Sequence, residues 1–280
     1  MHVVITGASR GVGRTAALAL AQKGASLSLV VRDRARGEDV ASEIRAVSGA
    51  GAVDVFVADL SLMSEVRRVA GEIAAAHPII DVLVNNAGAI FGERGLTSEG
   101  LEQTFATNHV AYFLLTRLLL PTLEAAPRAR VVVVASEAHR GARGVEWDDL
   151  RRERGYRGLP VYCESKLMNI LFAAELARRL EGTRVTSNSL HPGTVASNFG
   201  LDSGGFWIKL FYRWFRMFLT DEAKGARTTV HVASAPEVAE VTGKYFASCK
   251  VRTPSRAARD AEAARRLWKL TSELTGLPED

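Results

Sequence analysis

The chain has 280 residues, of which 47% are hydrophobic and 24% are charged, and its formal net charge is +5 at pH 7. This composition is typical of a soluble globular protein and excludes an intrinsically disordered chain. The basic excess is small and forms no long stripe with interleaved aromatic residues, so we expect no nucleic-acid partner. The two cysteines, Cys163 and Cys249, cannot form a disulfide framework, and no Cys-x-x-Cys pair or helical histidine pair predicts a metal site.

The first residues indicate neither a secretory leader nor a membrane anchor. A strand-like run begins at His2, and no apolar run reaches the roughly 18 residues that a membrane-spanning helix needs. We therefore expect a cytoplasmic protein. The length suits one large α/β domain over residues 1–280, because no repeat, linker or shift in composition marks a second domain.

Strand-like and helical stretches alternate along the chain. The predicted strands are 2–6, 26–31, 52–57, 81–84, 130–135, 185–190 and 244–247. The predicted helices are 12–22, 37–47, 64–76, 101–123, 161–180, 220–233 and 257–274. Alternation at this spacing predicts a doubly wound parallel α/β sheet of about seven strands with helices on both faces. The high valine content of the strands agrees with burial on both faces.

A glycine-rich turn follows the first predicted strand and opens the first predicted helix. Its candidate cofactor-binding residues are Gly7, Ser9, Arg10, Gly11, Val12 and Gly13. Glycine permits a tight turn and lets the backbone approach a pyrophosphate, which then lies at the helix N-terminus. The glycines could instead only close the turn, but three of them within seven residues favour phosphate binding.

Tyr162 and Lys166 are four residues apart at the start of an apolar helical segment. Residues at this spacing share one helix face, so both side chains should border the same cleft. A free tyrosine has a pKa of about 10 and is a poor proton donor or acceptor at neutral pH. A nearby cation lowers that pKa by favouring the phenolate. The alternative is a core tyrosine beside an ordinary solvated lysine, and the pair alone does not decide between them.

The order of several motifs resembles the short-chain dehydrogenase/reductase family over nearly the whole chain. These motifs are Thr6 to Gly13, Asp59, Asn85 to Gly88, Asn108, Ser136, Tyr162 with Lys166, and Pro192-Gly193. Longer stretches are similar to the retinol-dehydrogenase-like branch, namely 108–116, 135–139, 161–172 and 265–268. The resemblance implies a Rossmann-type fold and an oxidoreductase that moves a hydride between nicotinamide and a carbonyl or alcohol.

The resemblance also implies the roles of four catalytic residues. Tyr162 would exchange a proton with the substrate oxygen, and Lys166 would lower its pKa and hydrogen-bond the nicotinamide ribose. Ser136, at a strand end, would hydrogen-bond and orient the carbonyl. Asn108 would open the helix ladder and hold a water molecule in a proton relay, although it could also be a simple polar helix residue. Ala135 stands where the family often has serine, and Ser136 keeps the catalytic position.

Further cofactor contacts are implied at the ends of other strands. Asp59, after the third predicted strand, would contact the adenine. Leu60 directly follows it and would also bind the cofactor. The remaining implied residues are Asn86, Ala87 and Gly88 along the cofactor, and Pro192, Gly193 and Thr194 near the carboxamide. Ligands of open parallel sheets bind outside the carboxyl ends of the strands, where all these residues are expected.

The residues after the second strand bear on the choice of cofactor. Enzymes that prefer NAD usually end this strand with an acid that binds the ribose hydroxyls. Here Val31 takes that place and Arg32 follows, so Arg32 and Arg10 suit the 2′-phosphate of NADP(H). Asp33 is the counter-argument, because a shift of one residue in the strand end would favour NAD. We predict NADP(H), with NAD as the less favoured alternative.

Residues 206–218 combine large apolar side chains and basic residues at helical spacing. The resemblance places a substrate lid at about 194–220, so we predict that this segment covers a hydrophobic substrate pocket. A weak contact with an anionic membrane surface is the second interpretation, and a core or dimer contact of a homodimer is the third. A non-catalytic dinucleotide-binding regulator of the same fold remains an alternative function, although it would not need Ser136, Tyr162 and Lys166 together. A first strand that starts at residue 2 replaces the membrane anchor of the branch's vertebrate members, which puts a lipid-soluble substrate in doubt.

Overall fold

All described strands of the protein join one sheet. The computed structural model describes residues 1–47, 49–193 and 222–279. Its strands are β1 (His2–Thr6), β2 (Ser26–Val31), β3 (Val53–Val57), β4 (Val82–Asn85), β5 (Ala129–Val134), β6 (Val185–His191), β7 (Tyr245–Ala247) and β8 (Lys250–Arg252). The order is β3-β2-β1-β4-β5-β6-β7-β8. Neighbours are parallel except β7 and β8, so the doubly wound parallel sheet is confirmed.

The expectation of about seven strands was one short, because β8 leaves no hydrophobic signal in the sequence. Its three residues are all exposed, and it pairs only with β7, in the antiparallel direction. An edge strand of this length contributes no side chain to the core. A basic residue at each end is usual for an exposed sheet edge, where charge discourages pairing with another chain.

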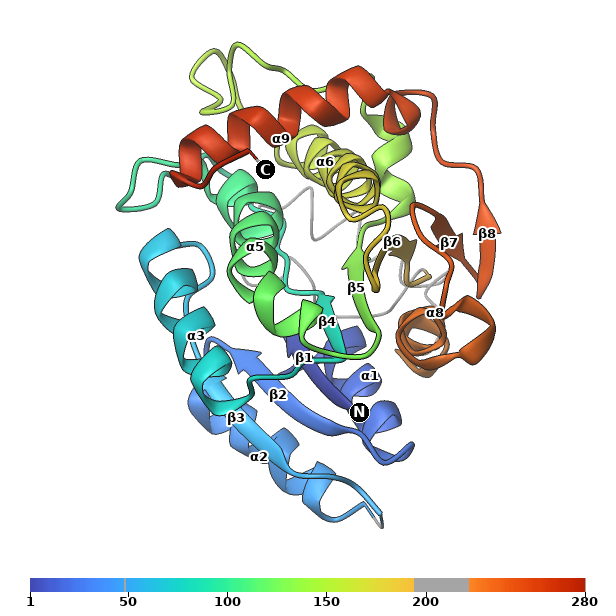
Figure 1. Cartoon of the computed structure of the whole chain (residues 1–280). Helices are drawn as coiled ribbons and strands as arrows, with labels where there is room; N and C mark the ends of the chain where they lie inside the picture. Colours follow the sequence, from blue (N-terminus) through green and yellow to red (C-terminus); the bar gives the residue numbers. More distant parts are fainter. Residues whose placement is uncertain (48, 194–221, 280) are drawn as a thin grey trace.

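Helices cover both faces of the sheet (Figure 1). They are α1 (Gly11–Ala21), α2 (Arg34–Arg45), α3 (Met63–Ala76), α4 (Gln103–Phe105), α5 (Ala111–Glu124), α6 (Gly158–Arg179), α8 (Glu222–Ser234) and α9 (Ala261–Thr275). Side chains of α1, α2 and α8 share one core cluster with the sheet, and those of α3, α5 and α6 share another. The C-terminal helix α9 packs along α6, on the second face.

The predicted helix 101–123 is one segment interrupted by a π turn. It consists of α4, the π-helical turn η1 (Ala106–Val110) and α5, and Asn108 lies in the middle of η1. The carboxylate of Glu102 begins the segment by accepting hydrogen bonds from the main-chain N–H groups of Thr104 and Phe105, both 2.8 Å long. Apolar periodicity predicts the helix but cannot register the one extra residue that a π turn contains.

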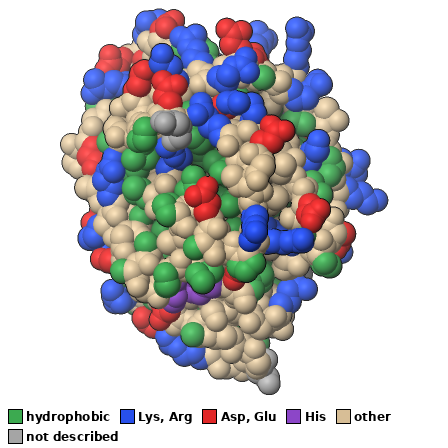
Figure 2. All heavy atoms as spheres, in the orientation of Figure 1, with side chains coloured by type: hydrophobic (Ala, Val, Ile, Leu, Met, Phe, Trp, Pro, Cys, Tyr) green, Lys and Arg blue, Asp and Glu red, His purple; other side chains and the backbone are tan. Residues whose placement is uncertain are grey.

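The helices and the surface charges bear on possible membrane and nucleic-acid contacts. None of the helices that the structure describes is long and apolar enough to cross a membrane. On the face shown in Figure 2, basic and acidic side chains are interspersed rather than gathered into one stripe. The predicted lid at 194–220 and the basic segment 206–218 lie outside the described residues.

His109, beside Asn108 in the π turn, is fully buried between helices. Its Nε2 donates to the Thr271 hydroxyl of α9 over 3.1 Å, because that hydroxyl itself donates to the carbonyl of Leu267. Its Nδ1 has no hydrogen-bond partner. Burial lowers the pKa of His109 to about 3, since a second proton would add an unpaired buried N–H and a charge. His109 therefore holds its place in the core only as the neutral imidazole.

This histidine predicts acid sensitivity of the fold. The folded pKa lies below the ordinary 6.5, so the unfolded chain binds more protons, and stability falls as the pH drops from 6.5 toward 3. One such group changes the free energy of unfolding by up to about 1.4 kcal/mol per pH unit. We expect His109→Gln to make this decline shallower when urea unfolding is followed by circular dichroism at pH 7.5, 6 and 5. Equal slopes for the two proteins would contradict this account of His109.

Candidate active site

The polar residues singled out from the sequence lie at one edge of the sheet. β1, β2, β3, β4, β5 and β6 run parallel, so their carboxyl ends share that edge. The glycine turn follows β1, Arg32 follows β2, and Asp59 follows β3. Asn86 directly follows β4, and Ser136 is the second residue after β5. In such a sheet this edge is the usual binding position for a ligand.

The glycine turn brings main-chain atoms close together. Gly7 and Gly11 have φ values of 68° and 57°, in the left-handed region that favours glycine. A Cβ on Gly13 would lie 2.3 Å from the carbonyl oxygen of Gly7 and 2.5 Å from Nδ2 of Asn86. Helix α1 begins at Gly11 with no side-chain cap on its N-terminus and no acidic residue in its first turn. The main-chain N–H groups in the first turn of α1 are therefore suited to bind an anion such as a pyrophosphate.

Thr6 joins the glycine turn to the residues after β4. Its hydroxyl accepts hydrogen bonds from the main-chain N–H groups of Asn86 and Ala87, both 2.9 Å long. The Asn86 side chain donates back to the carbonyls of Thr6 (2.8 Å) and Gly7 (3.3 Å). The two predicted parts of the cofactor site are therefore built as one unit. Sequence reasoning gave Thr6 no role of its own, because its partners are about 80 residues away.

We expect Gly13→Ala to disrupt this unit. The added methyl meets a carbonyl and an amide that are both fixed by the turn, so the backbone must move. Overpacking of this kind destabilises a protein by about 1–3 kcal/mol. Cofactor affinity should fall as well, measured by quenching of intrinsic fluorescence. The matched control is Gly71→Ala in α3, where a Cβ meets nothing within 4 Å. That change should leave affinity unaltered and stabilise the helix by about 0.5–1 kcal/mol.

Arg32 and Asp33, the two residues that follow β2, have different surroundings. Arg32 is exposed directly after Val31. The carboxylate of Asp33 accepts a hydrogen bond of 3.2 Å from the N–H of Arg36 and thereby caps α2, and it also lies 3.5 Å from the Arg36 guanidinium. The predicted helix 37–47 starts earlier than expected, at Arg34, for this reason. Asp33 is thus engaged with its own helix.

Tyr162 and Lys166 share one face of α6, as the spacing predicts. The Lys166 ammonium lies 5.6 Å from the Tyr162 ring centroid and 5.8 Å from that of Tyr112. It donates to the carbonyl of Val134 at the end of β5, over 3.2 Å. Tyr162 is half-buried, whereas Lys166 is only 3% exposed. The Lys166 cation is therefore anchored to the sheet, and the Tyr162 ring is the more exposed of the two side chains.

Burial decides the charge state of this pair. Desolvation lowers the pKa of Lys166 to about 7. An anion close by opposes that shift because it favours the ammonium. A negative charge close to Lys166, on Tyr162 or on a ligand, would therefore favour the ammonium form of the lysine.

Asn108 and Lys166 meet at Gly88. A Cβ on Gly88 would lie 3.3 Å from Oδ1 of Asn108 and 3.3 Å from Nζ of Lys166. The Asn108 amide accepts from Ala89 N (2.8 Å) and donates to Ala89 O (2.9 Å). It also donates to the Ser165 hydroxyl (3.0 Å), which donates to the carbonyl of Tyr162 (2.8 Å). Both amide hydrogens of Asn108 are thus used within the protein.

Ser136 begins a short 3-10 helix, η2 (Glu137–Gly141). Its hydroxyl accepts a hydrogen bond of 3.2 Å from the N–H of Ala138, and η2 packs against α6. The hydroxyl proton can be donated to a substrate oxygen while this bond is kept. Neither Ser165 nor the contacts of η2 were predicted, because their partners are set by packing between elements.

The remaining predicted residues lie at the same edge. Asp59 holds Ser61 through its Oδ1, with distances of 2.9 Å to the N–H and 2.7 Å to the hydroxyl, and Leu60 is buried. Pro192 and Gly193 follow β6, with Gly193 at a φ of 102°. Ser9 and Val12 are partly accessible in the glycine turn. Thr194 lies outside the described residues.

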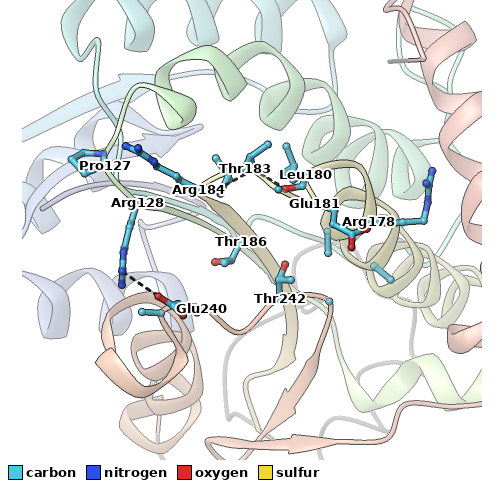
Figure 3. A pocket seen from close by; sticks show the side chains of 16 residues that line it. Pro127, Arg128, Arg178, Leu180, Glu181, Thr183, Arg184, Thr186, Glu240 and Thr242 are labelled. Carbon is cyan, nitrogen blue, oxygen red and sulfur yellow. Dashed lines mark hydrogen bonds and ion pairs between the residues drawn. The ribbon is translucent and has the colours of Figure 1, made fainter.

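A surface cavity of about 750 Å³ lies away from this site, at the opposite edge of the sheet (Figure 3). It is lined where β5 and β6 begin and α6 ends. Arg128 and Glu240 form an ion pair of 3.1 Å on one side, and Arg184 and Thr186 lie on β6 or just before it. No candidate residue from the sequence lines it, so it is separate from the candidate active site.

Comparison with known proteins identifies the family to which this chain belongs. A family model described as short chain dehydrogenase matches residues 1–203. This chain belongs to the short-chain dehydrogenase family. Human retinol dehydrogenase 14 is 40% identical over 290 residues, which cover 98% of this chain and 86% of that protein. Human retinol dehydrogenase 11 is 40% identical over 282 residues, with 99% and 86% covered. The family expectation, including the retinol-dehydrogenase-like branch, is confirmed.

Solved structures place this short-chain dehydrogenase among known folds. The crystal structure of an uncharacterized protein from Mycobacterium paratuberculosis has a TM-score of 0.80 and 35% sequence identity, and it covers 100% of this chain and 94% of that one. A structure from Beutenbergia cavernae has a TM-score of 0.69 and 27% identity, covering 88% and 94%. It is described as an NAD(P)-dependent gluconate 5-dehydrogenase with bound NADP at low occupancy.

Proposed function

We propose that this short-chain dehydrogenase is an NADP(H)-dependent oxidoreductase that interconverts an alcohol and a carbonyl group on a hydrophobic substrate. The observation that carries the proposal is the convergence of Lys166 and Asn108 on Gly88, with the partly exposed Tyr162 on the same helix face as Lys166. A structural lysine with no ligand role would have little reason to be buried beside a phenol and a glycine that leaves room for a ligand.

The chain's own residues have complementary roles in this proposal. The nicotinamide cofactor supplies or accepts the hydride when bound. Tyr162 gives a proton to the substrate oxygen during reduction and removes it during oxidation. Lys166 favours the phenolate and so keeps the phenol active near neutral pH. The Ser136 hydroxyl hydrogen-bonds the same oxygen and fixes its position. Asn108 holds Ala89 and, through Ser165, the first turn of α6.

The preference for NADP(H) rests on the end of β2. Arg32 is exposed there and can form charge-assisted hydrogen bonds with a 2′-phosphate. The capping bond of Asp33 to Arg36 engages that carboxylate with its own helix, which supports NADP(H) over NAD. The bound NADP described for the structure from Beutenbergia cavernae supports the same choice. The glycine turn, Asp59, Leu60 and the residues after β4 would hold the rest of the dinucleotide.

The substrate class rests on the relatives. The retinol dehydrogenases named above are named for a long apolar alcohol. A hydrophobic primary alcohol or aldehyde is therefore the substrate that we propose for this chain, and a cytoplasmic location remains part of the proposal.

A cofactor and substrate panel tests the function. Aliphatic and retinoid aldehydes, ketones and alcohols would be assayed by nicotinamide absorbance at 340 nm with NADPH, NADH, NADP and NAD. We expect turnover of apolar aldehydes with NADPH at a higher kcat/KM than with NADH. Binding of NADPH without turnover of any compound would favour the non-catalytic dinucleotide-binding alternative. A higher kcat/KM with NADH would contradict the cofactor assignment.

A further inference from the structure

The peptide bond between Ser136 and Glu137 is held at both ends by imidazole rings. The carbonyl oxygen of Ser136 accepts a hydrogen bond of 2.6 Å from Nδ1 of His139. The N–H of Glu137 donates to Nδ1 of His191, the last residue of β6, over 3.3 Å. The two rings thus fix the plane of the peptide that directly follows the serine proposed to bind the substrate oxygen.

These contacts determine the protonation state of both rings. Nδ1 of His139 carries a proton, because it donates to a carbonyl, and its Nε2 accepts from the N–H of Ser255 over 3.1 Å. Nδ1 of His191 has no proton, because it accepts from an N–H group. A second proton would sit on Nδ1 of His191, facing the N–H of Glu137, or on Nε2 of His139, facing the N–H of Ser255. Both histidines can therefore make these contacts only as neutral imidazoles.

The surrounding groups hold η2 in place from a second direction. The Glu137 carboxylate accepts from the hydroxyl of Tyr245 on β7 (2.8 Å) and from Arg140 (2.6 Å). Arg140 also donates to the carbonyl of Thr253 over 3.0 Å. The His139 ring lies edge-on to Tyr245, with 5.2 Å between ring centroids. With η2 anchored in this way, a change at the Ser136–Glu137 peptide moves the serine rather than the whole helix.

We propose that His191 and His139 are positioning residues that aim the Ser136 hydroxyl at the substrate oxygen, and that protonation of His191 releases this alignment and lowers turnover reversibly at acid pH. The inference rests on the proposed function of Ser136. Among the described residues, the charged and titratable groups that face His191 are Glu137 and His139, both from η2. The pKa of His191 is below its ordinary value because burial outweighs the attraction of Glu137. The loss of turnover should therefore begin below about pH 6.5.

Two substitutions of His191 separate alignment from folding. His191→Leu removes the acceptor, and loss of one main-chain hydrogen bond at a reacting group should lower kcat about tenfold at all pH values. His191→Asn places an amide oxygen near the position of Nδ1 and does not titrate. It should recover most of the lost kcat and shift the onset of the acid limb of the kcat profile to lower pH, where only the protonation of His139 remains. NADPH affinity should be similar in all three proteins. His77→Asn, at the amino edge of the sheet, is the matched control and should keep the wild-type profile.

A second measurement does not depend on turnover. In protein labelled with ¹⁵N-glutamate, the amide signal of Glu137 should shift as His191 titrates, and it should not shift in His191→Asn. A chain that turns over no substrate fails the proposed function, yet this titration can still be followed. The proposal is wrong if the Glu137 signal is insensitive to His191, or if His191→Leu keeps the wild-type kcat and profile. It is also wrong if His191→Asn keeps the wild-type onset of the acid limb, or if the Leu variant loses only thermal stability.

Discussion

Tyr162→Phe is expected to lower kcat by about 10²–10⁴-fold, the usual contribution of a positioned general acid or base. Phenylalanine keeps the ring that faces the Lys166 ammonium and removes only the hydroxyl that exchanges a proton. The measurement is steady-state turnover with NADPH and the best aldehyde of the panel. Binding of NADPH, followed by fluorescence titration, should change little, because the glycine turn and the residues after β4 are untouched.

The control for this prediction is Tyr156→Phe. The Tyr156 hydroxyl donates to the carbonyl of Phe91 over 3.0 Å and has no contact with Lys166 among those that the structure gives. Removing it should leave kcat within a few fold of the wild type. Comparable kcat values for the Tyr162 variant and the wild type would rule out the proposed role of the phenol and leave the fold assignment unaffected.

Arg32→Ala is expected to raise the Kd for NADPH about 10- to 100-fold and to alter the Kd for NADH only slightly. Hydrogen bonds to a charged group contribute about 1.5–3 kcal/mol, and NADH lacks the phosphate that would accept them. Isothermal titration with both cofactors measures the two changes directly. Arg45→Ala removes the same charge from the other end of α2 and should affect neither cofactor.

Asp33→Ala gives an independent check on the same assignment. Loss of an N-cap usually costs about 1 kcal/mol of stability, so the melting temperature should fall while the preference for NADPH persists. If the change instead weakens NADH binding selectively, Asp33 contacts the ribose and the end of β2 has been assigned to the wrong residue. Equal losses for both cofactors in the Arg32 variant would lead to the same conclusion.

The parts of the site that the sequence predicts are those whose geometry is local. The turn from Thr6 to Gly13 and the four-residue spacing of Tyr162 and Lys166 follow from strand, turn and helix geometry within a few residues. The sequence also predicts that β2 ends at Val31, although it does not predict that Asp33 caps α2. In each of these cases the predicted feature depends on residues that lie close together along the chain.

The parts that could not be predicted depend on contacts between distant segments. Ser165 bonds to a residue 57 positions away, and His191 bonds to one 54 positions away. No periodicity records such a pairing. The π turn at Asn108 adds one residue to a helix without altering its apolar character, and β8 is too short and too polar to be recognised. Tertiary packing decides all four features.

Asn108 and His109, two neighbouring residues of that π turn, contact different parts of the protein. Asn108 contacts Ala89 and Ser165, close to Tyr162, whereas His109 hydrogen-bonds Thr271 of the C-terminal helix. Consecutive residues of one turn therefore connect the catalytic centre to the last helix of the chain. Helix α9 is far in sequence from the candidate active-site residues, but it supports the π turn and α6 by packing against them. We therefore expect a change that displaces Thr271 to disturb the π turn that holds Asn108.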